Sequence, residues 1–142
     1  VTSLGSHSFQ NCPGELVVNC DIPSKAFANA QFTRVTIGDG VTTIGSEAFL
    51  GCSSLRLLNI HESLTKIGNK AFADCNSLVS LNIPEGVTRI GSYAFEECSS
   101  LTSIKIPDGV TSIGDAVFRN CRSLTSIKIP KGVTSIGEST FK

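Results

Sequence analysis

The chain has 142 residues, 17% of them charged, and its 12 basic and 12 acidic side chains cancel to a net charge of zero. This balance gives no electrostatic reason to expect nucleic-acid binding. No apolar run approaches the length of a membrane span, and Val1 begins no signal peptide, so we expect no direct membrane insertion of this segment.

A short repeat organises most of the chain. The stretch SLTSIKIPDGVTSIG at 100–114 returns 23 residues later, at 123–137, as SLTSIKIPKGVTSIG. Related units start at Val41, Leu64, Val87 and Val110, and both ends of the chain lie inside the pattern. Self-similarity at a fixed short period indicates stacked units. We predict one solenoid over 1–142, a segment of a longer array, irregular at 13–40 and regular from 41.

The irregular unit comes first in chain order and reads PGELVVNCDIPSKAFANAQFTRVTIGDG. Aligning VVNCDIP with LTSIKIP places Cys20 and Ile22 at buried strand positions, and Lys25 then leads directly to Ala26. This alignment predicts that the unit lacks its second strand and that the stack has a local bulge or groove here. Segments that break a pattern sometimes carry function.

Each regular unit predicts a strand, a turn, a second strand and a short helical segment. In LTSIKIP, Ile104 and Ile106 alternate with polar residues, as in a strand with one buried face. The P-x-G that follows is a turn, and VTSIG is a short strand rich in β-branched residues. Segments such as SYAFEEC then space an apolar residue, Phe and Cys as helical turns facing inward would.

Units this small bury their apolar faces only by stacking, with like residues on like. Stacked strands lie about 4.8 Å apart, whereas a helix with its side chains is about 10 Å wide. The helical side therefore needs more room than the strand side. The predicted fold is an α/β repeat, a curved solenoid with a concave parallel sheet and the helical turns outside.

These units resemble the leucine-rich-repeat superfamily, whose repeats carry L-x-x-L-x-L. The compound motif I-P-x-G-V-T-x-I-G-x-x-A-F-x-x-C-x-S-L is similar to the BspA-like branch, over nearly the whole chain except 13–40. Members of that branch are surface or secreted proteins associated with adhesion to host matrix proteins, epithelial cells or other microbes. The resemblance thus implies an extracellular or cell-surface location and host or microbial surface proteins as partners.

Cysteine and phenylalanine each form a row in the repeat. Stacked cysteines point the same way, which is poor geometry for disulfides, and there is no C-x-x-C or His pair to favour zinc. We interpret the cysteines as buried thiols, with disulfides or a metal as the alternative, and the phenylalanines as core rather than a ligand platform. The rows are Cys12, Cys52, Cys75, Cys98 and Cys121, and Phe9, Phe27, Phe49, Phe72, Phe95, Phe118 and Phe141. Cys12 and Cys20 are the one pair outside the row arrangement that could form a disulfide.

Catalytic motifs do not assemble. Ser63 and Lys66 have the S-x-x-K spacing of serine acyl-transfer enzymes, but the accompanying S-D-N and K-T-G elements are missing. His7 and His61 fall on unrelated positions of the repeat. We expect no enzyme activity, no cofactor and no metal.

The outward residues of the first strands define a candidate binding face. With Ile104 and Ile106 buried, Ser103 and Lys105 point outward, and the repeat register extends the row. Three of its residues are cations and none is a carboxylate, which favours an acidic or sulfated partner; ordinary solvated faces are the alternative. The row consists of Arg34, Thr36, Leu57, Asn59, Ser80, Asn82, Ser103, Lys105, Ser126 and Lys128.

These patterns favour a non-enzymatic adhesion or protein-binding module that uses the sheet face to bind surface proteins or anionic glycans. The chain has no Trp and a single tyrosine, Tyr93. Since interfaces draw their strongest anchors from Trp, Tyr and Arg, each unit should bind weakly, and many copies would supply avidity. The alternative is a stiff structural spacer without a ligand, which the near-identity of the last units suits.

Overall fold

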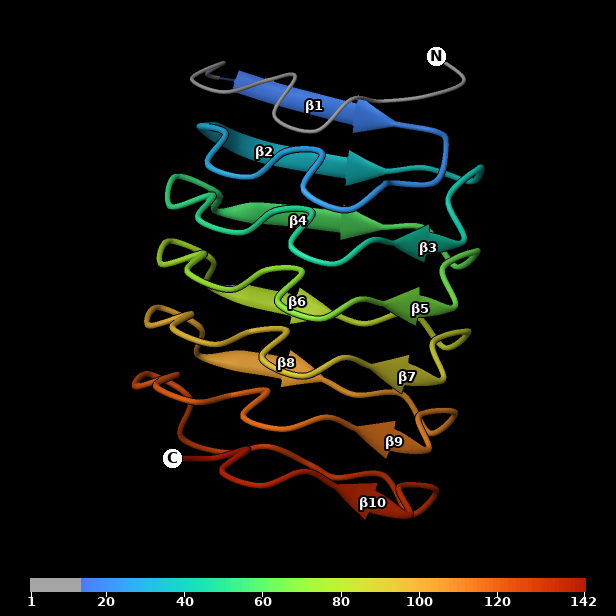
Figure 1. The fold of residues 1–142 in the computed structure, drawn as a ribbon, viewed down its shortest axis with the longest axis vertical. Helices are drawn as coiled ribbons and strands as arrows, with labels where there is room; N and C mark the ends of the chain where they lie inside the picture. The colour runs from blue at the N-terminus through green and yellow to red at the C-terminus, as the bar shows by residue number, and fades with distance from the viewer. Residues whose placement is uncertain (1–13) are drawn as a thin grey trace.

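The computed structural model describes residues 14–142, and these residues form a stack of coils in which like segments lie one above another (Figure 1). The first strand of each coil is β1 (Gly14–Val18), β2 (Phe32–Ile37), β4 (Leu57–Ile60), β6 (Ser80–Asn82) or β8 (Ser103–Lys105). Neighbours β1–β2, β2–β4 and β6–β8 pair in parallel. The outward residues of β2, β4, β6 and β8 are called the β2–β8 face below.

The second strand of each coil is shorter, and these strands pair into another parallel sheet. They are β3 (Thr43–Ile44), β5 (Lys66–Ile67), β7 (Arg89–Ile90), β9 (Ser112–Ile113) and β10 (Ser135–Ile136), in the order β10-β9-β7-β5-β3. Their outward residues form the β3–β10 face. Both strands predicted for the regular unit are thus confirmed in the units that start at Val41, Leu64 and Val87, together with the stacking of like on like.

The last copy of LTSIKIP, at 124–130, forms no strand, although its letters match those at 101–107. The expectation that Ser126 and Lys128 extend the sheet is therefore wrong. In this structure their coil has a neighbouring coil on one side only, and a strand is defined by the ladder bonds it makes with its neighbours. The local sequence is identical, so the letters alone do not account for the difference, and β10 of the same coil does pair with β9.

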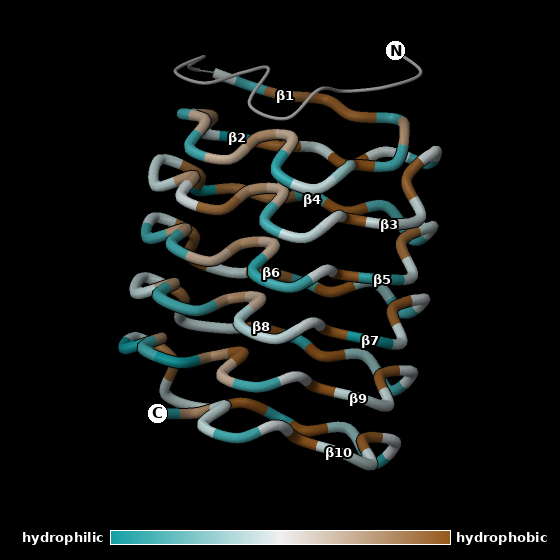
Figure 2. Tube along the Cα trace, viewed as in Figure 1, coloured by the Kyte–Doolittle hydropathy of each residue, from teal (hydrophilic) through white to brown (hydrophobic). Residues whose placement is uncertain are grey.

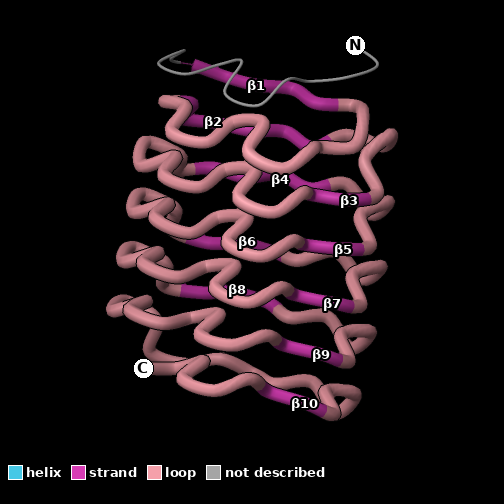
Figure 3. Tube along the Cα trace, viewed as in Figure 1, coloured by secondary structure: helices cyan, strands magenta, loops and turns pink. Residues whose placement is uncertain are grey.

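Turns, not helices, connect each second strand to the next coil, and residues 14–142 contain no helix (Figure 3). The predicted helical segment is wrong because its backbone bonds run between coils. The Phe49 N–H donates to the Ala71 carbonyl of the following coil at 2.8 Å, whereas the Ala48 N–H closes a local turn on the Gly45 carbonyl at 3.3 Å. An α-helix would instead satisfy every N–H four residues back in its own segment.

Residues with left-handed backbone conformation also prevent these turns from forming a helix. Glu47 has φ 58° and Gly51 has φ 71°, and the corresponding residues of other coils behave alike. Such φ values disfavour most residues with a Cβ and do not extend into helices of L-residues. Within the described chain, ten residues other than glycine have positive φ: Lys25, Asn29, Glu47, Lys70, Asp74, Tyr93, Glu97, Ala116, Asn120 and Ser139.

The absence of helices from the described coils removes the reason for expecting a concave sheet. The stacked phenylalanine rings are 5.1–5.8 Å apart, close to the spacing of about 4.8 Å between strands. The turn side therefore needs little more room than the strand side. The coils accordingly lie nearly parallel to one another in Figure 1.

The core runs along the axis of the stack, because apolar residues recur at corresponding places in successive coils (Figure 2). Phe27, Phe49, Phe72 and Phe95 are at most 1% exposed. Successive rings from Phe27 to Phe141 stack with interplanar angles of 3–22°. The interpretation of the phenylalanine row as core is confirmed from Phe27 to Phe118, whereas Phe141 is 51% exposed and Phe9 lies outside the described residues.

A row of buried thiols runs beside the rings. Each cysteine donates its S–H to a phenylalanine carbonyl in the preceding coil, as from Cys52 Sγ to Phe27 O at 3.1 Å and from Cys98 Sγ to Phe72 O at 3.2 Å. Burial raises the pKa of the Cys52 thiol to about 12. The buried-thiol interpretation is confirmed for Cys52, Cys75, Cys98 and Cys121, all free. Cys20 is also free, and Cys12 lies outside the described residues.

The irregular unit keeps both strand positions and shortens the turn between them. Val18 of β1 pairs opposite Ile37, so β1 occupies the first-strand position. Ile22 forms an isolated parallel bridge with Ile44 and thus occupies the second-strand position, reduced to one residue. The alignment that put Cys20 and Ile22 together in the first strand is therefore wrong. The residues missing from this unit are those of the turn.

Asp21 replaces the backbone that this shortening removes. In the regular coils a threonine N–H donates to the threonine carbonyl of the preceding coil, as from Thr65 to Thr42 at 2.9 Å. Here the N–H groups of Thr42 and Thr43 donate to Asp21 Oδ1, at 2.6 and 2.9 Å. The bond from Thr42 is the main cause of the lowered pKa of Asp21. The Asp21 carboxylate thus accepts the hydrogen bonds that backbone carbonyls accept in the later coils.

Candidate binding surface

The structure places the predicted outward residues as expected. Nine of the ten are exposed and Thr36 is partly buried, whereas the alternating residues Leu58, Leu81 and Ile104 are buried. On the paired strands, Arg34 lies opposite Leu57 and Asn82 opposite Lys105. Register joins β2 to β4 and β6 to β8, and β4 lies in contact with β6, so the predicted side chains of these four strands share one surface.

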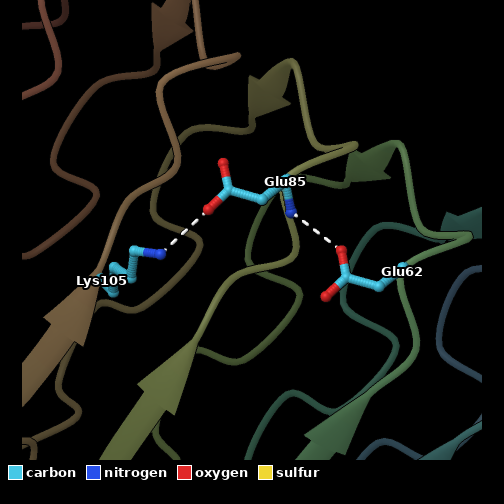
Figure 4. Close-up of polar contacts among 3 residues, drawn as sticks. All are labelled: Glu62, Glu85 and Lys105. Carbon is cyan, nitrogen blue, oxygen red and sulfur yellow. Dashed lines mark hydrogen bonds and ion pairs between the residues drawn. The ribbon is translucent and has the colours of Figure 1, made fainter.

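Lys105 is not a free cation on this surface. Its Nζ donates to Glu85 Oε1 at 2.9 Å, and Glu62 Oε2 in turn accepts the Glu85 N–H at 3.3 Å (Figure 4). The hydrogen bond to Glu85 is the main cause of the raised pKa of Lys105. Lys105 thus belongs to an exposed ion pair, and such pairs contribute little to stability.

The partner of Lys105 belongs to an acidic row along one edge of the β2–β8 face. Stacking the P-x-G turns and their equivalents aligns Asp39, Glu62, Glu85 and Asp108, all exposed, and Lys131 follows them. The strand row of regular units lacks carboxylates, as expected, but the adjoining turns supply them. This edge of the surface is therefore acidic, although the strand row beside it has no carboxylate.

The opposite edge is basic and contains a residue that the sequence analysis missed. A hollow of about 510 Å³ is lined by Thr33, Arg34, Ser54, Arg56, Leu57 and Ser77, with no carboxylate among them. Arg34 was predicted to face outward and Arg56 was not considered. Arg56 occupies the first variable position of L-x-x-I-x-I. That position is polar in most other units, and this could have indicated that Arg56 is exposed. Within the described residues, neither arginine forms an ion pair.

Exposed apolar side chains adjoin the arginines. Leu57 is 39% exposed and Val79 is 49% exposed, both on this surface. Arginine is among the residues that most often anchor interfaces, and its guanidinium forms bidentate bonds with carboxylates, sulfates and phosphates. The surface around β2 and β4 thus combines cations, hydroxyls and apolar contact area.

Tyr93 is already engaged within the molecule. Lys70 Nζ lies 5.5 Å and Arg119 Cζ 5.8 Å from the centre of its ring. Arg119 also pairs with Glu96. Because these cations come from the coils before and after Tyr93, the ring helps to tie three coils together and is a weaker candidate for a partner's anchor than Arg34 or Arg56.

Residues 14–142 contain neither a metal-binding cluster nor a membrane-spanning helix. No group of three or more His, Cys, Asp or Glu side chains is placed to hold a metal ion. No helix has the length and apolar character of a membrane span.

Parallel strands repeated coil upon coil, with L-x-x-I-x-I on the first strand, define a leucine-rich-repeat solenoid. The sequence matches the BspA type leucine rich repeat region in six copies over residues 20–142, so the chain belongs to that family. A comparison with curated proteins found no match.

Solved structures of similar fold come from bacteria. A leucine-rich repeat protein from Bacteroides ovatus is 32% identical with a TM-score of 0.78, over 83% of this chain and 30% of that one. A leucine rich cell surface protein from Faecalibacterium prausnitzii is 30% identical with a TM-score of 0.63, over 89% and 44%. A leucine-rich repeat protein from T. pallidum is 30% identical with a TM-score of 0.62, over 83% and 66%. The chain thus spans 30 to 66% of these three proteins.

Proposed function

We propose that this chain is a non-enzymatic binding module of a surface or secreted protein, and that it recognises a surface protein or glycan carrying anionic groups through the β2–β8 face. The observation that supports this most is the carboxylate-free hollow with Arg34, Arg56 and Leu57. The cell-surface description of the Faecalibacterium relative supports the location.

The binding centre in this proposal lies on β2 and β4 and not at Lys105 and Lys128. Lys105 is paired with Glu85 beside the acidic row, and Lys128 is not on a paired strand. An anionic partner placed there would meet the turn carboxylates. At Arg34 and Arg56 the same partner would meet two guanidinium groups and an apolar side chain.

The second candidate is a structural spacer. It is favoured by the way each coil bonds to the next along both strands and the turns, an arrangement that needs no ligand. A spacer predicts that exposed residues are interchangeable. A binding module predicts that Arg34 and Arg56 are not.

The test is a binding screen of the whole chain against matrix proteins and sulfated glycans at two salt concentrations. We expect binding at low salt that weakens at high salt, because charged contacts on a surface are screened within about 8 Å at physiological ionic strength. Arg34→Glu with Arg56→Glu should abolish it. The matched control, Arg122→Glu with Lys131→Glu, makes the same change of charge at two exposed residues away from the hollow and should bind as the parent does.

Both double variants should keep the thermal midpoint of the parent, since exposed substitutions usually change the free energy of unfolding by less than about 0.5 kcal/mol. Equal binding by the parent and the Arg34 and Arg56 variant would contradict the proposed site. No binder in the screen would favour the spacer.

A further inference from the structure

A second basic hollow lies on the β3–β10 face, away from the proposed binding surface. Its volume is about 290 Å³, and its polar lining comprises Ser46, Lys66, Asn69, Arg89, Ser92 and Ser112, with no carboxylate. The cations come from the paired strands β5 and β7, which lie one above the other in Figure 1. The hollow lies in the middle of the stack, with described coils on both sides.

The two cations are direct neighbours in the ladder. Lys66 pairs in register with Arg89, so their backbones are about 4.8 Å apart. Like charges at facing positions of adjacent strands are destabilising. Neither side chain forms an ion pair or hydrogen bond among residues 14–142. The chain therefore places two cations side by side with no counter-charge bound to them among its described residues.

The carboxylates closest in sequence are engaged elsewhere. Glu62 and Glu85 stand four residues before Lys66 and Arg89 on their turns. Glu85 accepts the bond from Lys105, and Glu62 accepts the Glu85 N–H (Figure 4). The hydrogen bonds of Glu62 and Glu85 are thus made to the neighbouring turn and to Lys105 of β8, and not to Lys66 or Arg89.

The repeat itself does not demand cations at this position. The corresponding residues of the other regular coils are Thr43, Ser112 and Ser135, which are neutral and make the same parallel pairs, and the irregular coil has Asp21 there. Among the described coils a basic residue occurs here in two adjacent ones, and the pairing of the neutral residues shows that the strand does not require it.

The other polar groups lining the hollow are suited to an anion. Asn69 Oδ1 accepts the Ser92 N–H at 3.0 Å, which leaves the Asn69 amide N–H groups as donors. Ser92 Oγ accepts the Asp115 N–H at 3.1 Å, which leaves its hydroxyl proton. Asp115, the carboxylate of the next coil in this row, accepts the Glu138 N–H. The groups left for a ligand are therefore two cations and neutral donors.

We propose that Lys66 and Arg89 form a binding site for a sulfate or phosphate ester group on the β3–β10 face. Arg89 would supply a planar guanidinium and Lys66 a point charge to the same oxyanion, and the hydroxyl and amide donors would complete its shell. The site does not depend on the Arg34 and Arg56 surface, since it lies on the other sheet.

The test follows backbone amide shifts of the whole chain by NMR at low ionic strength and neutral pH. Sodium sulfate and sodium phosphate are the probes, with sodium chloride at matched ionic strength as the reference. We expect saturable shifts at Gly91, Ser92 and Ser112 with the oxyanions and not with chloride. A galactose 6-sulfate arm and a glucose 6-phosphate arm then distinguish a sulfated glycan from a phosphoester as the source.

Variants decide whether the two cations are responsible. Lys66→Gln with Arg89→Gln should weaken oxyanion binding about tenfold or more, the loss expected when hydrogen bonds to charged groups are removed. The charge-keeping Lys66→Arg should retain binding, and the control Arg122→Gln with Lys131→Gln should match the parent. The double variant should also unfold at a temperature no lower than the parent's, because both side chains are exposed and lie on facing positions of adjacent strands.

The proposal is overturned if chloride produces the same shifts, if the Lys66 and Arg89 double variant binds as the parent does, or if the control variant loses binding equally. If the Arg34→Glu with Arg56→Glu variant loses binding in the surface screen and still binds sulfate at Lys66 and Arg89, the two sites are independent.

Discussion

The phenylalanine stack makes a quantitative prediction about the difference between a middle coil and the last one. Phe95 is fully buried and stacks on Phe72 at 5.6 Å and on Phe118 at 5.8 Å. Phe95→Ala removes a buried ring and leaves a cavity, a change that typically costs about 3–5 kcal/mol. Phe141 is 51% exposed and has the Phe118 ring on one face at 5.8 Å.

Phe141→Ala therefore loses about half of a buried ring and one stacked pair, an estimated cost of about 1–2 kcal/mol. Urea unfolding followed by far-ultraviolet circular dichroism measures both variants, with the slope of each transition checked against the parent. Since repeat stability is a sum of local units and nearest-neighbour interfaces, Phe141→Ala should mainly fray the last coil. Hydrogen exchange at the Phe118 N–H, which donates to the Thr140 carbonyl at 2.9 Å, reports that fraying. Equal losses of unfolding free energy in the two variants would refute a stack with a weaker end.

Two further predictions concern ionisable groups. The thiols of Cys52, Cys75, Cys98 and Cys121 should be protected from a thiol reagent in the native protein, because burial raises their pKa values. All four should react in denaturant without reductant. A disulfide between any two of them, detected by mass spectrometry, would contradict this. Asp21 has a folded pKa below its ordinary 3.8, so its contribution to stability is present above about pH 4 and is lost as the pH falls through the folded value. Asp21→Asn should therefore lower the unfolding free energy at pH 7 and have little effect near pH 2, measured by thermal unfolding across that range, and a pH-independent difference would argue against the carboxylate's role.

The sequence predicted the strands well because both carry explicit periodic signals. Ile104 and Ile106 alternate with polar residues, and both are buried. The turns were mistaken for helices because Ala-Phe-x-x-Cys places apolar side chains on one side of either structure. What separates the two is the backbone, which is left-handed at Glu47 and Tyr93 with no glycine to mark it.

The candidate surface was predicted in orientation but not in charge. The pair between Lys105 and Glu85 joins a strand to the turn of the preceding coil, 20 residues away. Predicting this ion pair requires the position of each turn relative to the strand of the next coil. The repeat alignment gives only which residues correspond, and not that position. Arg56 was missed for a simpler reason: only two of the three outward positions around each first strand were considered.

Departures from the repeat separate the binding module from the spacer. Residues that make the coils stack are the same from unit to unit, as the buried Phe49, Phe72 and Phe95 are. A spacer has no use for further differences, and random drift would scatter charges of both signs over its exposed positions. In this chain two pairs of cations that form no ion pair among the described residues, Arg34 with Arg56 and Lys66 with Arg89, line hollows without carboxylates. Lys66 and Arg89 face each other in register, which is unfavourable for the isolated fold, so the binding proposals predict an anionic ligand at this pair where a spacer predicts none.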